Sequence, residues 1–280
     1  YFEKLINLYA IKHNNLFGQI VVGLEADLSA EAYSGEFTKQ LAVVARFSNK
    51  GEFRVVTMKD FSKWYRKEFP LLSPPHFIES DDLLGKNKKV FWYQSPNYRV
   101  GLVYDRDSRQ TKIFDLRIYN SDLEEPYYIS PVGEITLSVT IPSLFDEVMN
   151  KDDVWILPFK EQISVRGDFN GVELDYVNGN KIILKPDHIE IAGEEVQLPE
   201  IITQARFIDV QRNNSSWEIS PKSSYISSRD GILVKGLRPE AKHLLASKRI
   251  IATLTVLTIV YFLFISTIIK NHKNFASLLA

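Results

Sequence analysis

Two carboxylate side chains follow a short apolar run near the start of the chain. Glu25 and Asp27 come directly after residues 19–24, QIVVGL. A short continuous apolar run is typical of a strand buried on both faces, and α/β barrels carry their functional groups at the carboxyl ends of such strands. A carboxylate held there can act as a general acid or base, or as a metal ligand. We therefore predict Glu25 and Asp27 as catalytic residues, against the alternative of solvated loop carboxylates.

Aromatic side chains suggest a second kind of chemistry in the middle of the chain. Tryptophan and tyrosine are dense between residues 92 and 128. Because the apolar C–H faces of sugars stack on aromatic rings, we select Trp92 and Tyr98 as carbohydrate-binding candidates. The alternative is that these rings form cross-strand core pairs, and alternation along a strand turns about half of them inward.

The sequence lacks the motifs of several other kinds of chemistry. The chain has no cysteine, which excludes disulfides, thiolate metal sites and cysteine nucleophiles. It also lacks the glycine-rich nucleotide motifs and the G-x-S-x-G elbow. A net charge of −1 gives no strong field for nucleic acid. We predict no metal ligand, nucleotide or nucleic acid, and the cofactor stays unknown.

The first seventy residues show an alternating order of elements. Their spacing predicts helices over residues 1–14, 37–44 and 61–69, and buried strands over residues 19–24 and 53–57. Thr57 and Asp60 form a capping box that begins the third helix, which ends before Pro70. This order is typical of βα units with a parallel sheet.

The same segment resembles a known family. The stretches GQIVVGLEAD, YSGEFTKQL and RVVTMKDFSKWYRKEFP are similar to the closing units of irregular (β/α) barrels in polysaccharide deacetylase-like and related glycoside hydrolase proteins. The resemblance covers residues 1–70 and implies deacetylation or glycoside hydrolysis of cell-envelope polysaccharide. The paired-Asp and His-x-x-x-His motifs of that family lie upstream in those proteins and do not occur in this chain. We therefore expect a C-terminal part whose preceding barrel units are missing.

A period of two replaces this pattern after a linker at residues 73–88. Alternating segments predict strands, and the turns at Asn170-Gly171 and Asn178-Gly179 are strong hairpin signals. Residues 143–150 are predicted as one short helix. About ten short strands at this spacing indicate an antiparallel β-sandwich over residues 89–220.

An uncharged run closes the sequence. Residues 250–269, IIATLTVLTIVYFLFISTII, carry no charge, glycine or proline. As a helix they would extend about 30 Å, the thickness of the hydrocarbon core of a bilayer. We therefore predict a transmembrane helix between a juxtamembrane linker, residues 221–249, and a tail, residues 270–280. The alternative is a buried core helix.

These elements predict an α+β chain: a partial (β/α)-barrel segment over residues 1–72, an antiparallel β-sandwich, and one C-terminal transmembrane helix. The protein would be a single-pass membrane protein with its folded part outside the cytoplasm, and its partners would be the lipid bilayer and a polysaccharide. Two functions fit this organisation. One is a fragment of a membrane-tethered carbohydrate-active enzyme, and the other is a non-catalytic envelope protein whose β domain binds glycan or a protein partner.

Overall fold

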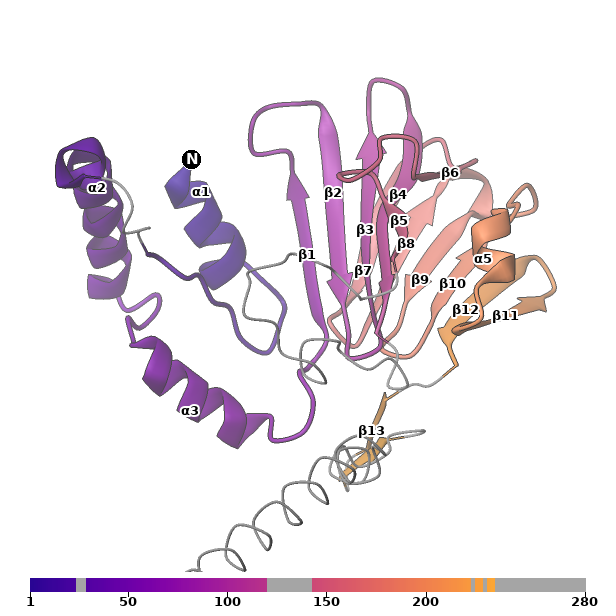
Figure 1. Cartoon of the computed structure of the whole chain (residues 1–280). Helices are drawn as coiled ribbons and strands as arrows, with labels where there is room; N and C mark the ends of the chain where they lie inside the picture. Colours follow the sequence, from indigo (N-terminus) through magenta and orange to yellow (C-terminus); the bar gives the residue numbers. More distant parts are fainter. Residues whose placement is uncertain (24–28, 120–142, 223–224, 229–230, 235–280) are drawn as a thin grey trace, which may run out of the picture. The chain divides into compact units, whose positions relative to one another are not determined.

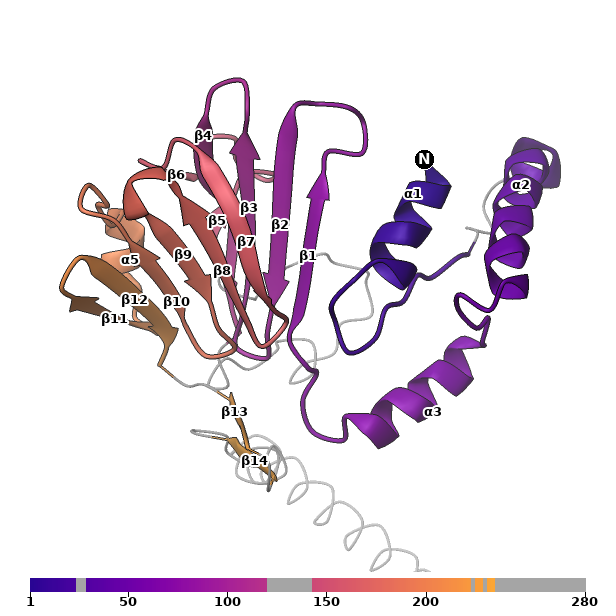
Figure 2. The same cartoon turned by 180° about the vertical axis from the view of Figure 1, so that it is seen from behind.

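Two antiparallel sheets dominate the part of the chain that the computed structural model describes, residues 1–23, 29–119, 143–222, 225–228 and 231–234. Sheet A has the order β1-β2-β3-β4-β5, with β6 paired to β4, and sheet B has the order β11-β12-β10-β9-β8-β7. Figures 1 and 2 show the two sheets face to face. A separate pair, β13 (Tyr225–Ser228) and β14 (Gly231–Val234), follows sheet B.

The strand bounds are as follows. Sheet A contains β1 His76–Asp81, β2 Lys88–Gln94, β3 Tyr98–Asp105, β4 Gln110–Ile118, β5 Ser143–Asp146 and β6 Trp155–Leu157. Sheet B contains β7 Gln162–Asp168, β8 Gly171–Tyr176, β9 Lys181–Leu184, β10 Ile189–Ala192, β11 Ile208–Asn213 and β12 Ser216–Pro221. A 3₁₀ turn, η2 (Val177–Gly179), joins β8 to β9, and a short helix, α5 (Glu200–Gln204), precedes β11.

The two hairpins predicted from the Asn-Gly signals of sheet B are confirmed, the first with its turn at residues 169–170. Asn178 and Gly179 have φ angles of 63° and 75°, in the left-handed region that asparagine and glycine tolerate best. This turn brings β8 antiparallel to β9, and β7 pairs with β8 in the same way. The paired Asn-Gly signals therefore locate three consecutive strands correctly.

One hydrophobic core lies between the sheets. Phe91, Leu102 and Leu116 of sheet A and Leu174 and Ile191 of sheet B belong to a single cluster and are fully buried. Polar bonds also join the two layers, because the Tyr93 hydroxyl donates to the Phe169 carbonyl at 3.1 Å. This packing agrees with the β-sandwich that the alternating pattern predicts.

The predicted barrel segment is wrong. The described residues before β1 form α1 (Phe2–Ile6), a π-helical turn η1 (Asn7–Ile11), α2 (Ala30–Asn49) and α3 (Met58–Glu68), and none of them forms a strand. Val21, Val55 and Val56, expected inside buried strands, are 64%, 65% and 51% exposed. A strand needs a neighbour for its backbone groups, and a short apolar run alone does not supply one.

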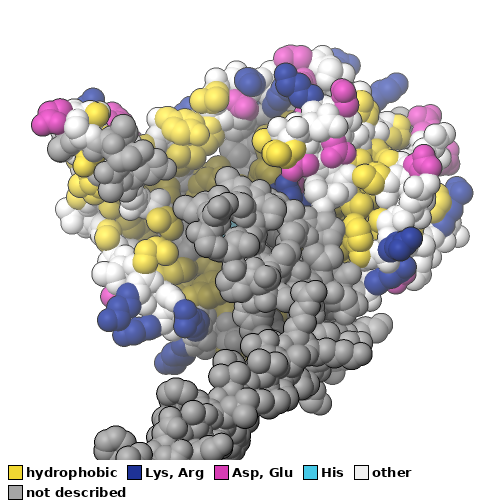
Figure 3. All heavy atoms as spheres, viewed as in Figure 1, with side chains coloured by type: hydrophobic (Ala, Val, Ile, Leu, Met, Phe, Trp, Pro, Cys, Tyr) yellow, Lys and Arg dark blue, Asp and Glu magenta, His cyan; other side chains and the backbone are white. Residues whose placement is uncertain are grey.

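The helix α3 follows its predicted cap and packs on aromatic rings. The Asp60 backbone N–H donates to Thr57 Oγ1 at 3.1 Å, which completes the capping interaction. The Phe17 ring lies within 5.4–6.2 Å of four rings of this region, those of Phe61, Trp64, Tyr65 and Phe69. Basic side chains gather over α3 in Figure 3, and Lys59, Lys63, Arg66 and Lys67 are exposed. The helix therefore packs an aromatic side on Phe17 and exposes a basic one.

Two smaller predictions also need correction. β1 lies inside the stretch expected to be a linker, residues 73–88. The segment expected to be a helix, residues 143–150, begins as β5. Leu144 and Phe145 are both buried because the register of β5 shifts beside Leu116. Apolar and polar residues therefore do not alternate along this strand, and the sequence pattern resembled that of a helix.

The predicted membrane anchor is corrected as well. No helix in the described ranges is long and apolar enough to cross a bilayer, so the structure does not support a single-pass membrane protein. The run on which the prediction rested, residues 250–269, lies outside these ranges.

Candidate functional site: the outer face of sheet A

A β-bulge shapes the face of sheet A that points away from sheet B, here called the outer face. Leu102 of β3 lies opposite Ile113 of β4, whereas Gly101 lies opposite Asp115, so Phe114 is the extra residue. A bulge of this kind turns two successive side chains to one side of a sheet. Phe114 and Asp115 therefore both occupy the outer face.

Strand register arranges the outer face as two neighbouring rows. In the first row, Trp92, Gly101, Asp115 and Asp146 lie opposite one another across β2, β3, β4 and β5. In the second row, Gln94, Arg99, Arg117 and Ser143 do the same. Diagonal neighbours in adjacent strands come within reach of long side chains, so each arginine of the second row can bind an aspartate of the first.

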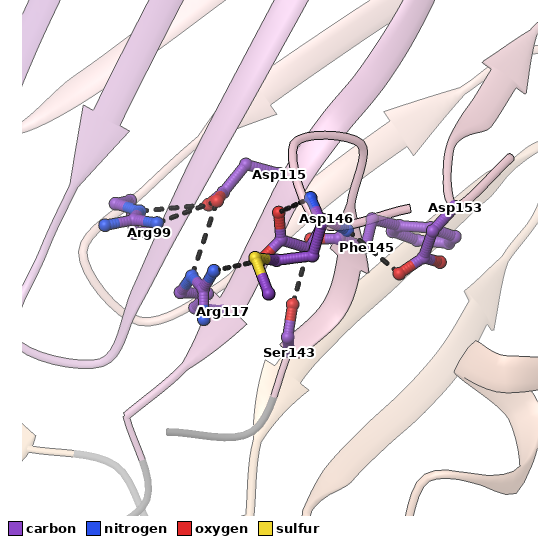
Figure 4. Close-up of polar contacts among 8 residues, drawn as sticks. Arg99, Asp115, Arg117, Ser143, Phe145, Asp146 and Asp153 are labelled. Atoms are coloured by element: carbon purple, nitrogen blue, oxygen red, sulfur yellow. Dashed lines mark hydrogen bonds and ion pairs between the residues drawn. The ribbon is translucent and has the colours of Figure 1, made fainter. Parts of the chain in front are cut away.

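The two arginines bind the two aspartates in a continuous network (Figure 4). Arg99 donates twice to Asp115, from Nε at 2.9 Å and from Nη2 at 2.7 Å. Arg117 Nε lies 3.4 Å from the same carboxylate, and Arg117 Nη2 donates to Asp146. The aspartate side chains are only 8% and 10% exposed, so these ion pairs are poorly screened by water. The bonds to Asp115 also raise the pKa of Arg99.

Two residues close in sequence, Met149 and Asp153, hold Asp146 in place. Its Oδ1 accepts a hydrogen bond from the Met149 N–H at 3.1 Å, and its own N–H donates to Asp153 Oδ2 at 3.0 Å. Ser143 at the other end of β5 donates to the Phe145 carbonyl at 3.0 Å. The network is therefore fixed at β5 by short-range contacts as well as by the arginines.

An aromatic pair continues the first row toward β2. The Trp92 and Phe114 rings meet edge to face, with centroids 5.0 Å apart, and the Arg99 guanidinium lies 5.4 Å from the Trp92 ring. Both rings lie close to Gly101, where an added Cβ atom would come within 2.7 Å of Phe114 Cζ and 3.0 Å of Trp92 Cη2. Glycine at this position therefore makes room for the two rings, and Trp92 remains partly exposed.

The predicted site residues fall in different places. Trp92 belongs to the outer face, as described above. Tyr98 is fully buried in the core, and its hydroxyl donates to the carbonyls of Lys185 at 2.7 Å and His188 at 3.1 Å. Burial also raises the pKa of Tyr98. Its ring therefore has no face open to a sugar. Glu25 and Asp27 lie outside the described residues, and their catalytic role stays a prediction.

The described residues hold no group of three or more histidine, aspartate or glutamate side chains that could bind a metal ion. The two carboxylates of the outer face are each engaged with a guanidinium group.

No protein-family model, curated protein or solved structure matches the chain. Any function therefore has to be inferred from the geometry of the site.

The sequence analysis did not predict the arginine–aspartate network, although the positions of the two arginines gave one indication of it. Arg99 and Arg117 each stand between apolar residues of a predicted strand, which is typical of side chains on an exposed face. Their alignment depends on the register across the bulge at Phe114. The amino-acid sequence alone does not show this shift in register between β3 and β4.

Proposed function

We propose that the β-sandwich is a non-catalytic carbohydrate-binding module, and that the outer face of sheet A is its glycan surface. Its ligand is an extended oligosaccharide. This is the glycan-binding form of the second function that the sequence suggested.

The Trp92 ring and the neighbouring Arg99 guanidinium carry this proposal. An indole ring supplies an apolar face for the C–H side of a sugar ring. Beside it, the Arg99 side chain is 31% exposed, and Asp115 holds its guanidinium through two hydrogen bonds. The outward N–H groups of this guanidinium can donate to sugar hydroxyls. Adjacent strands lie about 4.8 Å apart, so a chain lying across β2 to β5 crosses a new strand at about this interval.

The rigidity of the surface also supports binding. The guanidinium of Arg99 is held by two hydrogen bonds to Asp115 and lies over the Trp92 ring, so its position is set before any ligand arrives. Pre-positioned groups lose less conformational entropy on binding. An open sheet face suits a long, repetitive ligand better than a small molecule, which prefers an enclosed pocket.

Calorimetric titration of the full chain tests this function. The ligands are the linear hexasaccharides of glucose, xylose, mannose and N-acetylglucosamine. Trp92→Ala should weaken binding of the preferred sugar at least about tenfold, because the stacking face is lost.

Trp217→Ala is the matched control. Trp217 lies on sheet B, is also partly exposed and has the Arg212 guanidinium 5.1 Å from its ring. Its loss should leave the affinity unchanged. Absence of binding to all four sugars, or an equal loss in the two variants, would contradict the proposed function.

A further inference from the structure

A side-chain amide takes the place of a strand at the free edge of sheet A. Asn15 Nδ2 donates to the Phe77 carbonyl at 2.8 Å, and the Phe77 N–H donates to Asn15 Oδ1 at 2.7 Å. These are the two bonds that a residue of a neighbouring strand would make. The edge of β1 at Phe77 therefore already accepts an amide in strand geometry.

The next residue that faces this edge is Glu79. Backbone groups of alternate residues in an antiparallel strand point to opposite sides, so those of Phe77 and Glu79 point away from β2. Asp82, one residue beyond β1, belongs to the other set of alternate residues, and its N–H bonds to the carbonyl of Lys88 at the start of β2, as this pattern requires. Within the described part of the chain, the backbone N–H and carbonyl of Glu79 have no hydrogen-bond partner beyond this edge.

A pocket of about 320 Å³ opens along this part of the edge. One wall is β1 from Phe77 to Asp81, and the other contains Lys12, His13 and Asn14 at the end of η1. The volume suits two or three residues of an extended chain.

One cation at the pocket has no ion-pair partner among the described residues. Glu79 pairs with Lys89, and Asp81 pairs with Arg106, so the carboxylates on the sheet side are neutralised. On the opposite wall, the Lys12 ammonium forms no ion pair with any described residue. An anionic group is therefore the complementary ligand at this end of the pocket.

We propose that this pocket binds the C-terminal end of an extended polypeptide. The peptide adds to β1 as a strand, bonding to the backbone of Glu79 beyond Asn15, and its terminal carboxylate lies against Lys12. Addition of a strand to an exposed sheet edge gives affinity through main-chain bonds, and capture of the carboxylate gives specificity for a chain end. This site is separate from the glycan surface and does not depend on it.

Fluorescence anisotropy with a labelled peptide tests the site on the full chain. The probe is fluorescein-Ser-Thr-Val-Thr-Val with a free C-terminal carboxylate, compared with the same peptide as a C-terminal amide. Glu79→Pro removes the edge N–H without removing a bond to β2, because proline is tolerated where the N–H faces outward. It should weaken binding of both peptides about tenfold. Glu79→Thr keeps the N–H and, like Glu79→Pro, leaves Lys89 without its carboxylate, so it is the matched control and should change the affinity for the amide peptide less than about twofold.

Lys12→Gln separates capture of the carboxylate from strand addition. It should weaken the free-acid peptide about fivefold and leave the amide peptide unchanged. Lys4→Gln, at an exposed lysine of α1 outside the pocket, is its matched control and should affect neither peptide. Trp92→Ala should also leave peptide binding intact.

If Glu79→Pro does not fold, hydrogen exchange of the unmodified protein tests whether the peptide bonds to the Glu79 backbone. Saturating peptide should slow exchange of the Glu79 amide about tenfold or more. The proposal would be overturned if the peptide does not bind at about 1 mM or if Glu79→Pro leaves the affinity unchanged. It would also be overturned if the Glu79 amide exchanges equally fast with and without peptide.

Discussion

Arg99 and Arg117 stand directly opposite each other on β3 and β4, and the Asp115 carboxylate binds both of them. Like charges directly opposite in a sheet repel, so the pair is stable only with the carboxylate between them. Asp115 therefore links the two arginines and keeps both in position on the outer face.

Asp115→Asn should destabilise the fold by about 2–4 kcal/mol, because it leaves two partly buried cations without their shared partner. Urea unfolding followed by circular dichroism measures the loss. Asp209→Asn on β11, where the carboxylate is 55% exposed, is the control and should change stability by less than about 0.5 kcal/mol. An Asp115→Asn protein as stable as the control would mean that the network contributes little.

Gly101→Ala should displace the Trp92 and Phe114 rings, since the new Cβ atom would lie 2.7 Å from Phe114 Cζ. Overpacking of this kind costs about 1–3 kcal/mol and should alter the near-ultraviolet circular dichroism of Trp92. Gly35→Ala, in α2 with nothing within 4 Å of the added Cβ, should instead stabilise the protein by up to about 1 kcal/mol. Equal effects in the two variants would show that the rings do not need the space above Gly101.

Tyr98→Phe separates packing from binding at the second predicted sugar contact. The phenol donates to two backbone carbonyls inside the core, so its loss should cost about 1–3 kcal/mol while glycan affinity stays unchanged. In Tyr65→Phe the lost hydroxyl bonds only to Ser73 at an exposed position, and stability should hardly change. A Tyr98→Phe protein of full stability with weakened glycan binding would restore the sequence-based interpretation of Tyr98.

Sequence patterns predicted the parts of the fold that local chemistry decides. The Asn178-Gly179 turn needs φ values that few other residues adopt, and the Thr57 cap bonds within four residues of its own position. Both features are therefore visible in the order of residues.

The failures concern features that depend on distant partners. The valines at residues 55 and 56 have the composition of a strand, yet in the described structure they have no neighbour and stay exposed. Prediction of the candidate site from the sequence failed for the same reason. Trp92 was identified by its type, but the alignment of Arg99 with Arg117 requires the register that the bulge at Phe114 sets.

His188 should give the fold a pH dependence. Its hydrogen bond to Asp187 raises the pKa of the imidazole, and the same bond lowers the pKa of Asp187. The protonated pair therefore stabilises the folded state fully below the unfolded pKa of His188, about 6.5, and this contribution is lost as pH rises through the higher folded pKa.

The difference in unfolding free energy between the natural protein and His188→Gln isolates this effect. It should be largest near about pH 5.5 and fall toward zero by about pH 8.5. A difference measurement is needed because burial and the neighbouring His13 lower the pKa of His76, which makes stability fall with acidification. A difference that stays flat over this range would contradict the role given to the His188–Asp187 pair.

The glycan surface is tested most directly by the indole N–H signals of the four tryptophans in a ¹⁵N-labelled full chain. Trp92 lies on the outer face of sheet A, Trp217 on sheet B, Trp64 on α3 and Trp155 in the core. Tryptophan-to-phenylalanine variants assign the four signals before the hexasaccharide that binds in calorimetry is added. The proposed function predicts that the Trp92 signal shifts in proportion to occupancy while the other three stay in place. A shift of Trp64 or Trp217 with Trp92 unmoved would contradict it.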